Sequence, residues 1–222
     1  MSLTLYTISG APSPWRVAIG MAIKGIKYET KLMSLATNDH KAPSYLKINP
    51  RGTVPTLVND GIVLRDSIAM LAWLDRTFPD PPLFGVSDTE TAAIWQSTME
   101  TLDYLPDATS GVLSSIFFQG ATEATENLKE AAKVLGKELW RLEATLDASG
   151  FLSGANPGAA DAVAFPHVRL VQRATETKPE IMTALGLPSL HADFPNLADW
   201  ITRMEALPGV VDTFPPHWTS AD

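Results

Sequence analysis

The sequence predicts an α/β domain followed by an all-helical domain. Short β-rich runs alternate with helix-like runs over the first 80 residues, and a proline-rich segment at residues 79–87 then breaks the pattern. Beyond that segment, apolar residues recur at helical spacing in almost every stretch. We therefore place a first domain at residues 1–80, a linker at 81–87 and a helical domain at 88–222.

The first domain is predicted to follow the order β-α-β-α-β-β-α. The expected elements are strand 3–8, helix 14–24, strand 28–35, helix 44–48, strands 56–58 and 62–64, and helix 67–77. Gly25 suits the end of the first helix, and the Asp60-Gly61 pair suits a hairpin turn between the last two strands. This order is typical of a thioredoxin-like layer, a mixed sheet with helices on both faces.

The helical domain is predicted from four periodic segments, at residues 89–109, 122–148, 161–175 and 195–207. Pro195 fits the first position of the last helix. Trp140, spaced with Leu139 and Leu142, is expected in the core.

Residues 49–67 carry the strongest local signal of a binding site. Pro55 opens a strand although it cannot donate a ladder hydrogen bond, and a cis bond before it would fix a sharp turn that exposes the backbone of Val54. The Asp66-Ser67 pair opens a helix nearby. These features predict a cradle for the charged end of a peptide-like ligand.

The composition excludes several kinds of site. The chain has 222 residues, a formal net charge of −8 and no cysteine. The charge argues against non-specific binding to nucleic acid or anionic membranes. The missing thiols exclude disulfides, thiolate metal sites and a cysteine nucleophile. No apolar stretch reaches about 18 residues and no leader pattern is present, so we expect a soluble, cytoplasmic protein.

Four segments in order resemble the soluble glutathione transferases over essentially the whole chain, most closely theta- or zeta-like bacterial members. They read LYTISGAPSPWRVAIGMAIKG, HKAPSYLKINPRGTVPTL, LRDSIAMLAWLD and FLSGANPGAADAVAFPHV. The resemblance implies a glutathione-binding first domain, a helical domain with most of the electrophile site, and a homodimer. It also implies a detoxifying transferase that needs glutathione as co-substrate and no metal.

The chemistry of that family requires a group that stabilises the glutathione thiolate. A hydrogen-bond donor and the positive end of the first helix can do so, and lowering the thiol pKa by about two units corresponds to about 2.7 kcal/mol. The resemblance puts the expected hydroxyl at position 11, which is alanine. Ser13 is the preferred substitute and Ser9 the second, while a backbone N–H or a water could also serve. Tyr6 is expected to be a strand aromatic.

The resemblance also assigns the glutathione contacts. Val54, before Pro55, is expected to pair its backbone with the cysteinyl unit, with Thr53 beside it. Asp66 would receive the γ-glutamyl ammonium and Ser67 its carboxylate, and either could equally cap the helix. The glycine carboxylate would meet His40, supported by Lys41 or Arg51.

The candidates for the electrophile pocket are aromatic and polar residues of the second half. They are Tyr104, Phe117, Phe118, His167 and Trp218, with residues 114–119 as the pocket lip between two helices. Asp161, after Gly158, is expected to be a capping residue with a folding role only.

Two alternatives to a conjugating transferase remain open. The spacing of the first segment also resembles that of glutathione-dependent maleylacetoacetate isomerases, although Ala11-Pro12-Ser13 replaces their Ser-Ser-Cys run. The alanine equally favours a non-catalytic protein that binds glutathione or another ligand.

Overall fold

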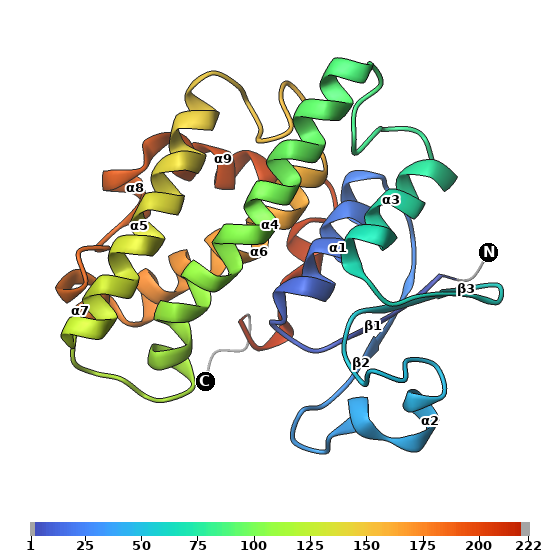
Figure 1. Cartoon of the computed structure of the whole chain (residues 1–222), viewed down its shortest axis with the longest axis horizontal. Coiled ribbons are helices and arrows are strands. Elements are labelled where there is room, and N and C mark those ends of the chain that lie inside the picture. The colour runs from blue at the N-terminus through green and yellow to red at the C-terminus, as the bar shows by residue number, and fades with distance from the viewer. Residues whose placement is uncertain (1–2, 219–222) are drawn as a thin grey trace. The chain divides into compact units, whose positions relative to one another are not determined.

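The computed structural model describes residues 3–218, which form two compact units (Figure 1). Of these residues, 3–86 and 205–218 make up the first unit and 87–204 the second. The sequence placed residues 205–218 in the helical domain, whereas in the structure they group with the α/β unit. The contacts responsible join Trp15 to Thr213 and Phe214.

The first unit contains the predicted βαβαββα order, which confirms the α/β fold class. Its elements are β1 (Thr4–Thr7), α1 (Pro12–Ile23), β2 (Glu29–Leu32), α2 (Pro43–Leu46), β3 (Thr56–Asn59), β4 (Ile62–Leu64) and α3 (Ser67–Thr77). Three 3-10 turns are added: η1 (Asp39–Lys41), η2 (Val211–Thr213) and η3 (Pro216–Trp218).

The sheet has the strand order β2-β1-β3-β4. β1 runs parallel to β2 and antiparallel to β3, and β4 returns antiparallel beside β3. In Figure 1, α1 and α3 lie on one side of these strands and α2 lies on the other. Tyr45 of α2 meets the sheet through Tyr6 of β1, with ring centroids 5.4 Å apart.

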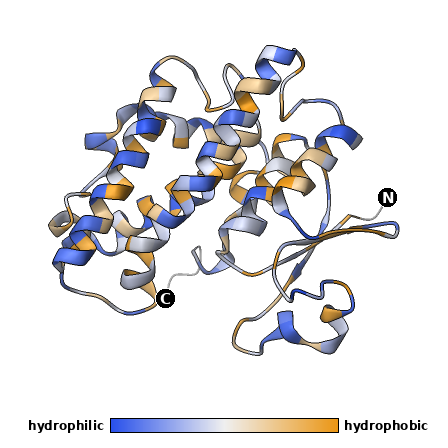
Figure 2. Ribbon diagram, viewed as in Figure 1, coloured by the Kyte–Doolittle hydropathy of each residue, from blue (hydrophilic) through white to orange (hydrophobic). Residues whose placement is uncertain are grey.

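The core of the first unit lies where α1 and α3 cover the sheet. Leu5, Leu57 and Ile19 are almost completely buried there. Apolar residues follow α1 and α3 in Figure 2. The two helices contact each other closely, because a Cβ at Gly20 would overlap the Leu71 side chain.

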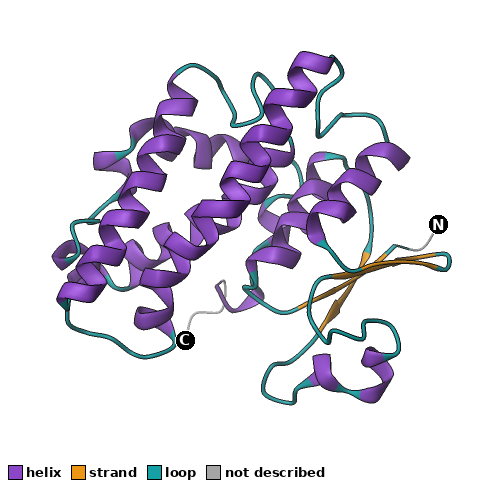
Figure 3. Cartoon of the chain, in the orientation of Figure 1, coloured by secondary structure: helices purple, strands orange, loops and turns teal. Residues whose placement is uncertain are grey.

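The second unit is wholly helical within its described residues (Figure 3), as predicted. Its helices are α4 (Asp88–Phe117), α5 (Glu126–Asp147), α6 (Ala159–Thr177), α7 (Pro179–Ala184), α8 (Leu190–Asp193) and α9 (Pro195–Glu205). The sequence did not predict α7 and α8, which are too short to show a helical period. The predicted loop at 114–119 was wrong in part, because α4 continues to Phe117.

Helix α6 is the centre of the second unit. Its first ten residues, 159–168, are all buried, and α4 packs against both α6 and α5. Asp161 accepts hydrogen bonds from the Leu152, Ser153 and Gly158 backbone N–H groups and from Trp200 Nε1, at 2.8–3.1 Å. Burial raises the pKa of Asp161, and these four donors oppose that shift. The carboxylate has the predicted capping role.

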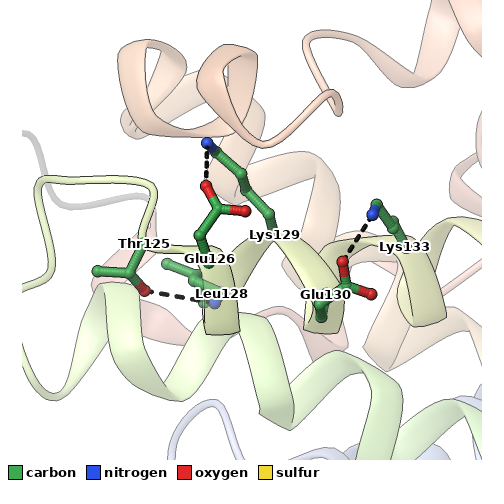
Figure 4. A network of polar contacts seen from close by, with 6 residues as sticks. All are labelled: Thr125, Glu126, Leu128, Lys129, Glu130 and Lys133. Atoms are coloured by element: carbon green, nitrogen blue, oxygen red, sulfur yellow. Dashed lines mark hydrogen bonds and ion pairs between the residues drawn. The ribbon is translucent and has the colours of Figure 1, made fainter.

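The start of α5 is stabilised by local polar contacts (Figure 4). Thr125 Oγ1 accepts from the Leu128 N–H at 3.3 Å, as an N-cap residue does. Lys129 pairs with Glu126 at 2.8 Å, and an equivalent pair follows one turn later at Lys133. These contacts lie on the solvent-exposed side of the helix and support folding.

Trp140, on the same helix, corrects a sequence expectation. Its side chain is 58% exposed instead of lying in the core, and its ring packs against Phe194 with centroids 5.1 Å apart. Leu139 and Leu142 belong to the buried stripe of α5, and Trp140 lies next to that stripe instead of within it. Among the described helices, none combines the length and the apolar character needed to cross a membrane.

Candidate functional site

Three chain segments meet at one end of the sheet. β1 pairs with β3 at Tyr6–Thr56, so the same register carried forward places Ile8 opposite Val54. β3 pairs with β4 at Leu57–Leu64, and that register carried outward places Val54 opposite Ser67. The loop after β1, the segment before β3 and the start of α3 therefore share one end of the sheet.

The segment before β3 has the predicted turn geometry. The Val54–Pro55 bond is cis, as the sequence suggested, and Pro55 is buried while Val54 is half-buried. The Thr53 carbonyl accepts from Asn49 Nδ2 at 2.8 Å and from Tyr45 Oη at 2.6 Å. Asn49 and Tyr45 are not among the residues predicted from the sequence, because no local pattern indicates that their side chains support this segment.

The start of α3 combines an exposed carboxylate with a buried hydroxyl. Asp66 is the N-cap, and its Oδ1 accepts from the Ile68 and Ala69 N–H groups at 2.9 Å each. Ser67 is the first helical residue and is 7% exposed. The capping role of Asp66 is thus observed, and the positive end of α3 favours an anion beside Ser67.

A buried cation lies in the field of Asp66. Arg16 of α1 is 3% exposed, and burial lowers the pKa of its guanidinium to about 10, while the negative charge of Asp66 acts in the opposite direction. The two charges thus stabilise each other electrostatically. This end of the sheet holds both signs of charge, as a zwitterionic ligand requires.

Three basic residues lie on the neighbouring loop. His40 and Lys41 belong to η1, and Arg51 follows the Asn-Pro turn. Lys41 Nζ donates to the Gly52 carbonyl at 2.8 Å, which ties the two parts of the loop together. His40 Nδ1 is buried and has no hydrogen-bond partner among residues 3–218.

The loop before α1 differs from the expected helix start. α1 begins at Pro12, with Ala11 as an N-cap that makes no side-chain bond, so Ser13 is the second helical residue. Pro12 and Pro14 have no N–H, and the Ala11 and Trp15 N–H groups donate to the Ile8 and Ala11 carbonyls. Ser13 is therefore the residue of the first turn that can offer both a backbone N–H and a hydroxyl.

Ser9, the second candidate hydroxyl, has a partner that the sequence did not predict. Its Oγ lies 2.9 Å from Nδ1 of His217, in the C-terminal part of the same unit. Tyr6 packs on Tyr45, as expected for a strand aromatic.

The four predicted electrophile-pocket residues of the second unit do not form one cluster. Trp218 belongs to the first unit, and the other four belong to the second. Tyr104 and Phe117 are both on α4, but 13 residues of helix separate them by about 20 Å, too far to line one small pocket. Phe118 is 86% exposed, and His167 is 4% exposed within α6.

Tyr104 lines a hollow of about 370 Å³ between α4 and α5. The hollow is strongly polar, because Glu100, Glu138 and Arg141 also line it and the Arg141 guanidinium lies 5.7 Å from the Tyr104 ring centroid. Such a lining does not suit an apolar electrophile. Among residues 3–218, no group of three or more His, Asp or Glu side chains is placed to hold a metal ion.

Comparison with known proteins identifies the family of the chain. The glutathione S-transferase N-terminal domain family matches residues 11–77, and the corresponding C-terminal domain family matches residues 119–203. Glutathione S-transferase 1 of Dianthus caryophyllus is 31% identical over 169 residues, which cover 75% of this chain and 76% of that protein. A maleylacetoacetate isomerase of Pseudomonas aeruginosa is 28% identical over 200 residues, covering 86% and 93%.

Among solved structures, a glutathione S-transferase from the Antarctic clam Laternula elliptica is similar over 100% of this chain and 96% of its own. Its TM-score is 0.84 and its sequence identity 27%. The two family matches together cover more than half of the chain, and the Dianthus caryophyllus relative is more than 30% identical. The chain belongs to the glutathione S-transferase family.

Proposed function

We propose that this protein is a glutathione transferase that stabilises the glutathione thiolate for attack on small apolar electrophiles. The observation that carries the proposal is the convergence of Val54 and Ser67 with the loop after β1 at one end of the sheet. Peptide backbone, the N-terminus of α3 and hydroxyl donors therefore lie at the same end of the sheet, which suits a short zwitterionic peptide with a thiol.

The peptide part of glutathione would be bound along residues 53–67. Val54 would exchange backbone hydrogen bonds with the cysteinyl unit, in the manner of a short added strand, with Thr53 and Pro55 shaping the turn. Asp66 would receive the γ-glutamyl ammonium, and Ser67 would donate to the γ-glutamyl carboxylate at the start of α3. Both N–H bonds that cap α3 are accepted by Oδ1 of Asp66, which leaves Oδ2 for the ammonium.

The glycine carboxylate would lie near the basic loop of His40, Lys41 and Arg51. These residues supply positive charge on a chain whose net charge is −8. The buried Nδ1 of His40 supports this assignment, because a buried polar atom without a partner costs free energy until a ligand satisfies it.

The thiol would lie at the start of α1, where Ser13 offers a hydroxyl and a backbone N–H. A cysteine-like thiol has a pKa of about 8.5, so only a few per cent is thiolate at neutral pH. Donors at the positive end of the helix favour the anion. The thiolate then forms a bond to an electrophilic carbon, and the leaving group departs with the bonding electrons.

The experiment compares conjugation of glutathione to an aromatic chloride in the wild type and in Ser13→Ala. We expect activity in the wild type and a loss of about 10- to 100-fold in the variant, the range for a hydrogen bond to a charged atom. If the wild type binds glutathione and shows no activity with any electrophile, a non-catalytic glutathione-binding protein is the correct description.

The second candidate function is a glutathione-dependent isomerase. The resemblance to the Pseudomonas aeruginosa maleylacetoacetate isomerase over 93% of its length favours it. An assay that follows isomerisation of maleylacetoacetate, with and without glutathione, separates the two activities. Turnover that requires glutathione but consumes none would establish the isomerase.

We further propose that the protein is a cytoplasmic homodimer, as its family resemblance suggests. Sedimentation equilibrium should give twice the 24.0 kDa mass of the chain.

For the electrophile, we propose Trp218 as a wall of the site, because its ring packs against Trp15 of α1 with centroids 5.2 Å apart.

A further inference from the structure

The C-terminal part of the first unit is fastened to the start of α1. Trp15 Nε1 donates to Thr213 Oγ1 at 2.8 Å, and the Trp15 ring makes edge contacts with Phe214 and Trp218 at centroid distances of 5.5 and 5.2 Å. η3 therefore lies beside the loop in which Ala11 occupies the position of the family's hydroxyl.

His217 contacts this loop at two adjacent residues. Its Nδ1 lies 2.9 Å from Ser9 Oγ, and its Cε1 would lie 3.4 Å from a Cβ built on Gly10. Gly10 has φ +77, so it turns the chain between β1 and α1 and also leaves room for the imidazole. The ring position is thus fixed by a hydrogen bond and by packing.

The tautomer of His217 decides which atom of the pair is the donor. A serine hydroxyl has a single proton and two lone pairs. If Nδ1 accepted that proton, Ser9 would have none for a ligand. If Nδ1 carries a proton and donates to Ser9 Oγ, the Ser9 O–H is directed away from the ring and is polarised by the bond that its oxygen accepts.

We propose that His217 is a positioning residue that holds the Ser9 hydroxyl as a donor to the glutathione sulfur. This inference rests on the proposed function and adds a second donor, on the other side of Ala11, to those of Ser13. Register places Ser9 at the same end of the sheet as Val54, where the cysteinyl unit would bind. The C-terminal segment thereby completes the thiolate site.

Three variants test the role: Ser9→Ala, His217→Leu and His217→Asn. Leucine removes the ring nitrogen, whereas the asparagine side-chain nitrogen stands the same number of bonds from the backbone as Nδ1 and can still donate. His191→Leu, on α8 of the second unit, is the matched control. The readouts are the ultraviolet absorbance of bound thiolate and the separate values of kcat and KM for glutathione.

We expect Ser9→Ala and His217→Leu each to lower kcat and the bound thiolate fraction by about three- to tenfold, with KM changed less than about twofold. His217→Asn should recover most of the loss, and the Ser9→Ala/His217→Leu double variant should be no worse than either single one. Three results would overturn the proposal. They are wild-type kcat and thiolate fraction in His217→Leu, an equal loss in His217→Asn and His217→Leu, and additive losses in the double variant.

Nitrogen-15 NMR of the histidine rings tests the pair without any activity. The free wild-type protein should show a proton on Nδ1 of His217. The signature of that proton should be lost in Ser9→Ala. An unprotonated Nδ1 would overturn the positioning role even if conjugation is observed. Absence of thiolate in a wild type with a protonated Nδ1 would instead refute the proposed function, and with it the donor role of Ser9.

Discussion

Replacement of Asp66 by asparagine separates its two roles at the start of α3. Asparagine caps helices about as well as aspartate, so the hydrogen bonds from the Ile68 and Ala69 N–H groups, both 2.9 Å long, should persist. The substitution removes the negative charge that we assign to the γ-glutamyl ammonium. It also removes the charge that supports the buried Arg16 guanidinium.

The structure sets the expected size of the effect. A hydrogen bond to a charged group contributes about 1.5–3 kcal/mol, but Asp66 is exposed and solvent screening reduces this to about 1 kcal/mol. The dissociation constant for glutathione should therefore rise by about fivefold. Because the cap is kept, the free energy of unfolding should fall by less than about 1 kcal/mol, whereas Asp66→Ala should lose about 1 kcal/mol more.

Calorimetric titration with glutathione measures the effect, and a glutathione analogue without the α-amino group is the ligand control. The penalty of Asp66→Asn should disappear with that analogue and shrink at high salt. Asp60→Asn is the matched protein control, because it removes the same charge in the β3–β4 turn, at the other end of the hairpin. Unchanged glutathione affinity in Asp66→Asn, or an equal loss in Asp60→Asn, would refute the assignment.

Three further predictions concern the stability of the fold. Gly52→Ala should destabilise the protein by about 1–3 kcal/mol more than Gly61→Ala in chemical denaturation, and it should weaken glutathione binding. Both glycines have positive φ, but only a Cβ at position 52 would meet a backbone atom, at 2.8 Å. Equal losses of stability in the two variants would contradict this prediction. Asp161→Ala should cost about 3–5 kcal/mol of unfolding free energy, since it leaves three buried N–H donors and the half-buried one of Ser153 without an acceptor. A loss below about 1 kcal/mol would show that water replaces the carboxylate. The Lys24 ammonium is buried and pairs with Asp75 Oδ1 at 2.9 Å. Asp75→Ala should therefore destabilise the protein more than Lys24→Met, because it leaves the buried charge without this partner. Equal melting temperatures of the two variants, or the opposite order, would contradict this prediction.

Local signals predicted the elements that local contacts determine. α3 begins at Ser67 and ends at Thr77, as expected, because Asp66 caps its start and the helix stops just before Pro79. α4 extends eight residues beyond its predicted end at Thr109. The local sequence signals there are weak enough for tertiary packing to override them. Short helices such as α7 leave no period to detect.

In the candidate site, too, features set by neighbouring residues were predicted and features set by distant residues were not. The cis bond before Pro55 and the cap at Asp66 follow from residues within a few positions of each other. The Ser9–His217 contact joins residues 208 positions apart, and no pattern near either residue indicates it. Tyr104 and Phe117 were grouped by residue type, which does not specify how far apart two positions lie along one long helix.

The most direct test of the account is the ultraviolet absorbance of glutathione thiolate on the wild-type protein, followed against pH. We predict that bound glutathione shows thiolate at neutral pH, with a thiol pKa lowered by about two units, and that Ser13→Ala shifts the titration back toward that of free glutathione. Glutathione that binds by calorimetry but titrates as it does in free solution would contradict the proposed function.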